Sequence, residues 1–192
     1  MRGINYTKAI AIVHGQSEYN IVRYIKSKLR IPVEIYSRNN GKINIEISSV
    51  NDILKNRDFK DINGFVSKFS KVELNTKKRP VNIKIFMIMD VDNTSVADFN
   101  AYKNKSLFPK SWLKDILIPI WNDNNLEEVL NRIGYYYATN DKQKKNYKRA
   151  FPVERGSQDL KSIEKLRDEL QNISQSNMDE FLTFCLNNCP KF

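Results

Sequence analysis

Two aspartates that end an apolar stretch have the residue types and the spacing for metal chemistry. Asp90 and Asp92 follow residues 83–89, the most apolar strand-like run of the chain. On an extended backbone, residues two apart project to the same side, so both carboxylates would face one ligand. Their charge and oxygen atoms suit a Mg²⁺ or Mn²⁺ ion. Alternatively, Asp90 begins a turn and Asp92 caps the next element.

A histidine and a glutamate after the first apolar run form a second candidate group. Residues 8–13 are apolar and rich in β-branched side chains, and His14 and Glu18 follow them. Imidazole exchanges a proton near neutral pH, and it binds Mn²⁺ better than Mg²⁺. We therefore expect His14 and Glu18 to be catalytic, and Glu18 to join Asp90 and Asp92 as a metal ligand. The alternative for His14 is a strand-end residue hydrogen-bonded by neighbouring backbone.

A segment late in the chain interleaves aromatic rings with cations. Rings can stack on bases and cations can neutralise phosphates, so the segment predicts contact with nucleic acid. The net charge of +10 and the pI near 9.5 also favour polyanionic partners. The predicted contact residues are Lys142, Lys144, Lys145, Tyr147, Lys148 and Arg149. The alternative is a solvated loop whose tyrosines pack on the body of the protein.

The elements that would position these residues alternate between strands and helices. Strands are expected where β-branched and aromatic residues cluster between turn signals, at residues 8–13, 33–37, 42–47 and 83–90. Helices are expected where apolar residues recur at helical spacing, at residues 17–30, 49–56 and 59–69. Ser17 should cap the first helix, Pro32 should end it, and Gly64 should interrupt the third.

The second part of the chain should form mainly helices. We expect a polar loop at residues 93–104, an edge strand within 112–121, and helices at 126–133, 157–173 and 178–186. Pro119 favours an edge strand because proline cannot donate a ladder hydrogen bond. Since ligands bind at the carboxyl ends of parallel strands, the four candidate residues at the first and central strands should converge in one cleft.

Length and composition limit the class of protein. With 192 residues, the chain is long enough for a real core, and we expect an α/β domain over residues 1–150 with a helical C-terminal extension over 151–192. Two cysteines are too few for a disulfide framework, which favours a reducing, cytoplasmic setting. No apolar run approaches the ~18 residues of a membrane span, and the N-terminus does not have the pattern of a signal peptide. The sequence leaves the oligomeric state open.

Two short motifs resemble phosphatase signatures but lack necessary partners. The run from His14 to Asn20 resembles the N-terminal signature of the phosphoglycerate mutase and histidine phosphatase family, which has Arg where this chain has Val13 and needs a second histidine. His14 is the only histidine here. The run from Asp90 to Thr94 resembles the nucleophile loop of haloacid-dehalogenase-like phosphatases, although that loop normally follows the first core strand. A phosphatase of either type is therefore the weaker alternative.

The two acidic groups taken together resemble the Toprim domain of topoisomerases, primases, OLD-family nucleases and RloB-like proteins. The family's Glu-Gly-x-x-Glu/Asp motif matches His14 to Glu18, and its Asp-x-Asp motif matches Asp90 and Asp92. Residues 118–130 are also similar to a Pro- and Glu-containing segment of RloB-like members. The resemblance covers about residues 8–133 and rests on short motifs. It implies a three-layered, Rossmann-like, mainly parallel sheet and metal-dependent cleavage of phosphodiester bonds in DNA or RNA. The resemblance to the OLD and RloB-like groups also implies a role in host defence.

One departure from the Toprim pattern bears on catalysis. The family's first glutamate gathers Mg²⁺ and moves a proton, and His14 stands in its place. Either Glu18 supplies the missing carboxylate in a modified metal site, or the protein has lost catalysis and retains the fold for binding. In the second case it would be a non-enzymatic module that binds nucleic acid or a protein partner through its basic face.

Overall fold

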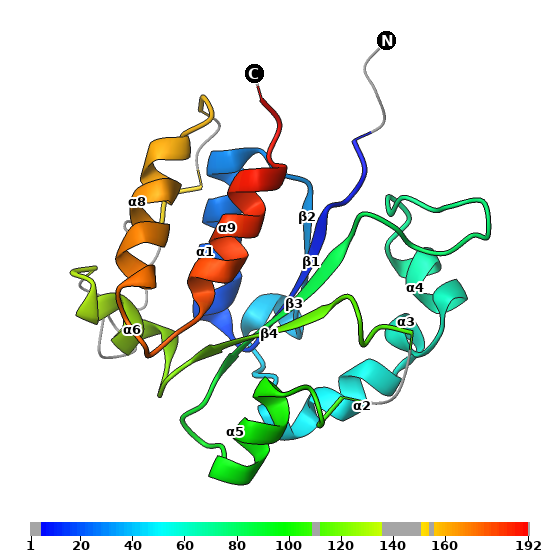
Figure 1. Ribbon diagram of the computed structural model, residues 1–192, viewed down its shortest axis with the longest axis horizontal. Coiled ribbons are helices and arrows are strands. Elements are labelled where there is room, and N and C mark those ends of the chain that lie inside the picture. Colours follow the sequence, from blue (N-terminus) through cyan, green and yellow to red (C-terminus); the bar gives the residue numbers. More distant parts are fainter. Residues whose placement is uncertain (1–4, 109–111, 136–150, 154–155, 192) are drawn as a thin grey trace.

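A parallel sheet forms the centre of the computed structural model, which describes residues 5–108, 112–135, 151–153 and 156–191. Its strands are β1 (Ala9–Val13), β2 (Val33–Tyr36), β3 (Lys84–Asp90) and β4 (Leu117–Asn122), in the order β2-β1-β3-β4. Every neighbouring pair is parallel. Helices cover both faces of this sheet (Figure 1). The prediction of a three-layered α/β fold with a mainly parallel sheet is confirmed.

The position of β3 inside the sheet, between β1 and β4, explains why its sequence is apolar without alternation. Residues 85–89 are fully buried, and successive side chains point into two different cores. Strands covered by helices on both faces have this continuous apolar pattern. By contrast, β4 lies at the edge of the sheet and accommodates Pro119, as expected.

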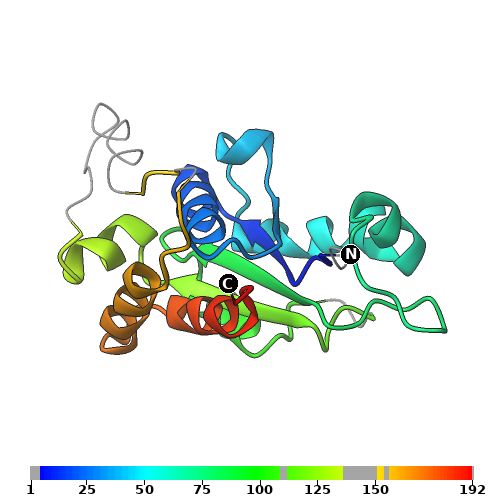
Figure 2. The ribbon, with the colours of Figure 1, turned by 90° about the horizontal axis from the view of Figure 1, so that it is seen from above.

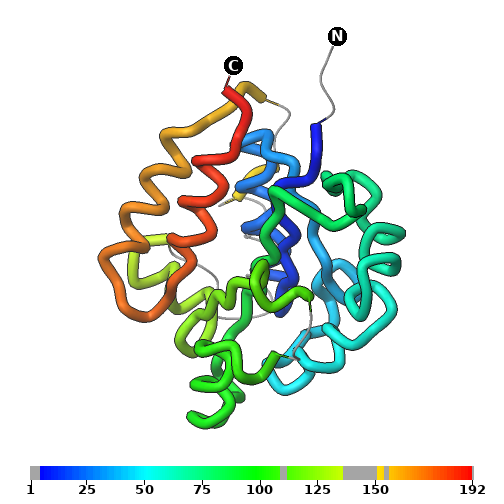
Figure 3. The backbone as a smooth tube through the Cα atoms, turned by 45° about the vertical axis from the view of Figure 1, so that its right-hand side comes forward, coloured from blue at the N-terminus to red at the C-terminus, as the bar shows by residue number. Residues whose placement is uncertain are grey.

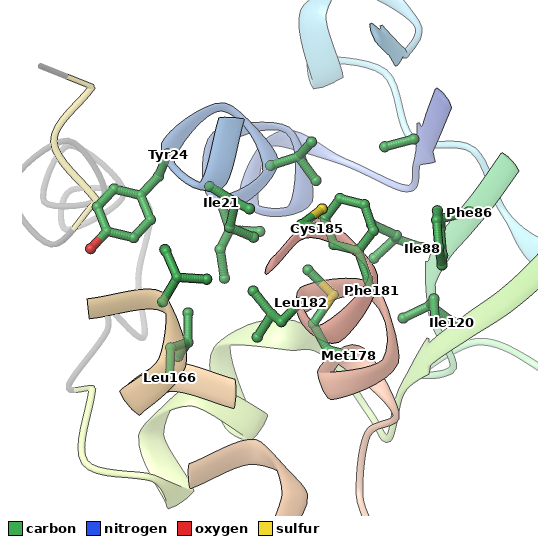
Figure 4. Packing of buried hydrophobic residues seen from close by; sticks show 14 of the residues in the cluster. Ile21, Tyr24, Phe86, Ile88, Ile120, Leu166, Met178, Phe181, Leu182 and Cys185 are labelled. Atoms are coloured by element: carbon green, nitrogen blue, oxygen red, sulfur yellow. The ribbon is translucent and has the colours of Figure 1, made fainter. Parts of the chain in front are cut away.

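One face of the sheet is covered by helices from both ends of the chain. These helices are α1 (Gln16–Leu29), α6 (Leu126–Arg132), α8 (Leu160–Gln171) and α9 (Met178–Asn188). Figure 4 shows how Ile21 of α1 and Leu182 and Cys185 of α9 pack toward Phe86 and Ile88 of β3. The C-terminal helices therefore share a core with the sheet, while the division of the chain at residue 151 stays a prediction.

The other face of the sheet is covered by four shorter helices. These are α2 (Val50–Lys55), α3 (Arg57–Lys60), α4 (Ile62–Lys68) and α5 (Val96–Lys103), preceded by the 3-10 turns η1 (Asn39–Gly41) and η2 (Ile47–Ser49). Phe59, Phe65 and Phe69 pack in pairs with ring centroids 4.9 to 6.2 Å apart. Figure 2 shows the two helical layers from above, and in Figure 3 the trace begins and ends at one end of the molecule.

Two predicted elements differ from the structure. Residues 42–47 form no strand. Ile45 enters the core opposite α1 from an extended segment and Ile47 from the start of η2, and the one bridge of this segment among the described residues pairs Ile43 with Arg38. The alternation in residues 42–47 reports burial, not strand pairing. The polar segment predicted as a loop at 93–104 contains α5 instead. The sequence did not indicate this helix, because Tyr102 is the only fully buried side chain of α5.

Helix boundaries also differ by short distances. The first helix begins at Gln16, so Ser17 lies inside it and Gly15 occupies the cap position. The break between α3 and α4 falls at Asp61, whose carboxylate accepts a hydrogen bond from the backbone N–H of Gly64 at 2.9 Å. Asp159, not Ser157, caps α8. In each case, a hydrogen bond to the backbone decides where the helix starts.

The structure also bears on membranes and thiols. No helix in the described part of the chain combines the length and the apolar character needed to cross a bilayer. Both cysteines, Cys185 and Cys189, are free thiols. Burial raises the pKa of the Cys185 thiol well above its usual value.

Candidate functional site

The candidate site lies where β1 and β3 end side by side. From β1 the chain crosses to β2 on one side, and from β2 it returns past β1 to β3. The direction of the connections therefore reverses between β1 and β3. Such a switch point leaves a crevice at the carboxyl ends of the strands, where α/β proteins bind ligands. His14 follows β1 and Asp90 ends β3, so the fold brings the two predicted groups to one place.

Glu18 is held in the first turn of α1 with its carboxylate turned inward. Its Oε2 accepts a hydrogen bond from the backbone N–H of Gly15 at 2.9 Å, and the residue is 1% exposed. A carboxylate is favoured at this end of a helix by the helix dipole. Its other oxygen, Oε1, is buried and has no hydrogen-bond partner among the described residues. A buried acceptor without a donor is costly, which marks this atom as available to a ligand.

Asp90 is fixed by groups from β4 and α6. Its Oδ1 accepts hydrogen bonds from the Asn122 side-chain amide and from the Leu126 backbone N–H, each at 3.1 Å. Asn122 is fully buried, and its own Oδ1 accepts from the Ser176 hydroxyl at 3.0 Å. The carboxylate at the end of β3 is thereby braced from the neighbouring strand and from the loop before α9.

Glu18 and Asp90 form a buried carboxyl pair. Burial, and next the charge of Glu127, raises the pKa of Glu18 to about 7. Burial, and next the charge of Glu18, raises the pKa of Asp90 well above its usual value. The two groups are close enough for the charge of Glu18 to raise the pKa of Asp90, so ionising both carboxyl groups at once is unfavourable. The pair therefore holds a proton to a higher pH than an isolated carboxyl would.

His14 presents one ring nitrogen of known role. Its Nδ1 lies 2.9 Å from the Ile45 carbonyl oxygen. A carbonyl only accepts, so Nδ1 carries the proton, and in the neutral ring Nε2 holds the lone pair. A positive charge on His14 would lower the pKa of Asp90, which places the ring near that carboxyl. The ring is hydrogen-bonded by backbone, as the structural alternative expected, and it also faces the carboxyl pair.

Glu127 belongs to the site, although the sequence pattern assigned it no role beyond its place in residues 118–130, the segment similar to RloB-like members. Its Oε1 accepts a hydrogen bond from the Ser17 hydroxyl at 2.5 Å, which links α6 to the first turn of α1. Its negative charge contributes to the raised pKa of both Glu18 and Asp90. The position of Glu127 after the exit of β4 was the available signal. Asn122, the brace of Asp90, gave no comparable signal.

Asp92 lies outside the buried group. The strand β3 ends at Asp90, so the two aspartates do not share the extended backbone that would align their carboxylates. Asp92 is exposed, and its backbone N–H donates to the Asn124 carbonyl at 2.9 Å. The structure thus brings His14, Glu18 and Asp90 together and separates Asp92 from them by burial.

The carboxyl pair fits some metal ions better than others. Within the described ranges, no group of three or more His, Cys, Asp or Glu side chains is arranged to hold a metal ion. A closed zinc-type cage therefore does not fit. Mg²⁺ is usually bound through one or two carboxylates, with water and substrate phosphate completing the shell. Two buried carboxylates and the unpartnered Oε1 of Glu18 fit this second arrangement.

The predicted nucleic-acid contacts cannot be placed in the same way. Lys142, Lys144, Lys145, Tyr147, Lys148 and Arg149 all lie outside the described residues. Their assignment stays a prediction from sequence.

Comparison with known proteins identifies no relative. No family model matches this chain, no curated protein matches it by sequence, and no solved structure matches its fold. The fold and the site define a class only, which is a parallel α/β protein with a buried carboxyl pair at its switch point. Any function must be argued from those side chains.

Proposed function

We propose that this protein is a metal-dependent enzyme that cleaves phosphodiester bonds in nucleic acid, with Glu18 and Asp90 as ligands of Mg²⁺ or Mn²⁺. The observation that carries the proposal is the unpartnered Oε1 of Glu18, buried beside a second carboxyl at the switch point. A cation placed there would offset the cost of burying the pair. The net charge of +10 and the resemblance to Toprim nucleases support nucleic acid as the substrate class.

The residues of the site have separable roles in this proposal. A bound ion would supply charge neutralisation for a phosphate and would lower the pKa of a water molecule. The hydrogen bond to Ile45 fixes the ring of His14, so that Nε2 can accept a proton from an attacking water. Asn122 and the Leu126 N–H hold Asp90 in place. Glu127 positions Ser17 and adds negative charge beside the pair.

The first prediction tests the two proposed ligands against a neighbouring acid. Asp90→Asn and Glu18→Gln keep the side-chain shape and remove one ligand charge each, so metal affinity and Mn²⁺-dependent nicking should fall together. Loss of a residue that only supports a ligand typically costs 10–100-fold, so loss of a ligand should cost about 100-fold or more. Metal affinity is measured by calorimetry, and nicking is measured on supercoiled DNA and on RNA.

Asp92→Asn is the matched control for that experiment. It makes the same chemical change two residues away, at an exposed side chain outside the buried pair. We expect it to retain metal affinity and nicking within about threefold, as surface substitutions usually do. Equal loss in Asp90→Asn and Asp92→Asn would contradict the ligand assignment and restore the Asp-x-Asp site expected from sequence.

The competing function is a non-enzymatic module that binds nucleic acid or a protein partner. Two observations favour it: the absence of a three-residue metal group among the described residues, and the backbone hydrogen bond that occupies one nitrogen of His14. Thermal melts separate the two functions. If Mn²⁺ does not change the melting temperature of the wild type, and the protein nicks no substrate, the result supports the non-enzymatic binding function.

We place either activity in the cytoplasm, because the chain has two free thiols and no disulfide. A role in host defence is supported by the resemblance to the OLD and RloB-like groups.

A further inference from the structure

A groove with a volume of about 490 Å³ runs along the outer side of α1. Tyr19, Arg23 and Lys26 line it from that helix, at spacings of four and three residues, which place them on one helical face, and Arg30 lines it just past the end of the helix. The seven helical steps from Tyr19 to Lys26 rise by about 10 Å. The groove therefore offers a row of side chains rather than a single contact.

The charge of the groove is uniformly positive. Its described lining contains three exposed cations and no acid. Arg23 lies over the ring of Tyr19, 5.7 Å from its centroid, and no ion pair joins Arg23 or Lys26 to an acid among the described residues. Cations on one helical face that form no ion pair with an acid, such as Arg23 and Lys26 within the described part of the chain, attract the phosphates of a chain.

The groove continues beyond the end of α1. A second hollow of about 560 Å³ shares Lys26 and Arg30 with it and adds Lys71, together with one acid, Glu34. The two hollows make a longer path than a single phosphate ion would need.

The other end of the groove lies at the first turn of α1, the turn that also carries Glu18. Tyr19 follows Glu18 in α1, and its hydroxyl lies 3.4 Å from Oδ1 of Asn40. Asn40 belongs to η1, and the next residue, Gly41, packs directly against the backbone of Gly15 at the start of α1. The groove therefore ends at the loop that packs on Gly15, whose backbone N–H donates to the Glu18 carboxylate.

Apolar side chains in the groove favour an unpaired strand. Ile35 of β2 and Val153, which is 50% exposed, lie among its lining residues together with the ring of Tyr19. Bases in a duplex are stacked and cover one another, whereas unpaired bases can contact rings and apolar groups.

We propose that this groove binds a single strand of nucleic acid, with Arg23 and Lys26 on its phosphates, and leads that strand to Glu18 and Asp90. The inference rests on the proposed function, since the bound strand would be its substrate. It differs from the contact predicted at residues 142–149, because it uses only side chains of the described groove.

The test is direct binding of labelled single-stranded DNA and RNA of about 15 nucleotides, a length typical of single-strand sites. Fluorescence anisotropy is measured with a chelator present, over a series of salt concentrations. The variant Arg23→Gln/Lys26→Gln should bind about tenfold more weakly, and its salt slope should be smaller by about 1.4, at about 0.7 for each lost phosphate contact.

The matched control is Lys55→Gln/Lys114→Gln. It makes the same change in net charge at two exposed lysines outside the groove. Control affinity should stay within about twofold of wild type, because distant charges are screened. An equal loss of affinity in both double variants, or no loss in the groove variant, would overturn the inference. Tighter binding of a blunt duplex than of either single strand would overturn it as well.

Failure of the groove and failure of the proposed function give different results. Binding is measured without metal. A wild type that binds through the groove but never nicks would therefore support the groove as a binding site and contradict the proposed enzyme activity. If the wild type nicks and the KM of Arg23→Gln/Lys26→Gln is unchanged, the enzyme activity is supported and the groove is contradicted as the substrate-binding site.

Discussion

At the scale of single residues, the site shows how burial controls the protonation of a carboxyl group. Asp159 caps α8 near the surface, and hydrogen bonds from Ser162 lower its pKa. Glu18 also accepts a backbone hydrogen bond at a helix start, but it is 1% exposed, and burial raises its pKa to about 7. The buried carboxyl is thereby the one that can gain or lose a proton near neutral pH, whereas the capping carboxyl near the surface stays ionised.

The raised pKa of Glu18 predicts a pH dependence of stability in the metal-free protein. The folded state holds this proton up to about pH 7, whereas an unfolded glutamate loses it near 4.5. Between these values the folded state binds more protons, so the free energy of unfolding is highest below pH 4.5 and falls as pH rises to about 7. The raised pKa of Asp90 acts in the same direction.

Thermal melts from pH 4.5 to 7.5 in the presence of chelator measure this effect. In Glu18→Gln the decline should be much smaller, because one of the two titrating groups is gone. Glu164→Gln, which removes an exposed carboxyl of α8, should keep the wild-type decline. A wild type whose melting temperature rises across this range would contradict the burial argument.

At the scale of elements, the loop after β2 sets the position of the first turn of α1. Asn39, Asn40 and Gly41 all have positive φ angles, of 46°, 54° and 82°. Asparagine and glycine are the residues that adopt this left-handed conformation most readily. The loop packs so closely on α1 that a Cβ at Gly41 would lie 2.7 Å from the Gly15 carbonyl oxygen. Gly15 in turn holds Glu18, so a connection far from the chemistry supports the site.

Gly41→Ala should therefore damage both stability and ligand binding. A left-handed alanine costs about 1–2 kcal/mol, and the clash with Gly15 should add about 1–3 kcal/mol. Gly134→Ala is the matched control, because Gly134 has a similar φ of 85° but open space where the Cβ would stand. Denaturant unfolding gives the two costs, and calorimetry gives Mn²⁺ affinity. Equal costs in both variants would show that the packing of the loop against α1 carries no energy.

At the scale of the whole molecule, the features of the fold that could be predicted are those that depend on local sequence patterns. The apolar run of β3 and the helical spacing in α1 and α8 gave the sheet and its covering layer. Glu127 and Asn122 were missed because they reach Asp90 and Glu18 only through tertiary folding. The alternation in residues 42–47 was misleading because burial of alternate side chains does not require a neighbouring strand.

Burial also ties the C-terminal helices to the sheet, which yields the last prediction. Phe181 of α9 is fully buried, with its ring centroid 4.9 Å from that of Phe86 in β3. Phe181→Ala should cost about 3–5 kcal/mol, which lowers the melting temperature by roughly 10 °C in a chain of this size. Leu160→Ala, at a side chain that is 38% exposed, should cost much less.

Tryptophan fluorescence and far-UV circular dichroism test whether the lowered melting temperature of Phe181→Ala applies to the whole chain. Trp112 and Trp121 pack against the core on the opposite face of the sheet, although the backbone N–H of Trp121 also donates to Asn177 at the start of α9, so their fluorescence reports mainly on the layer opposite α9. If the chain unfolds as one cooperative unit, fluorescence and far-UV circular dichroism should give the same lowered midpoint in Phe181→Ala. A fluorescence midpoint that stays at the wild-type value would mean that residues 151–192 unfold by themselves, as the division expected from sequence implies.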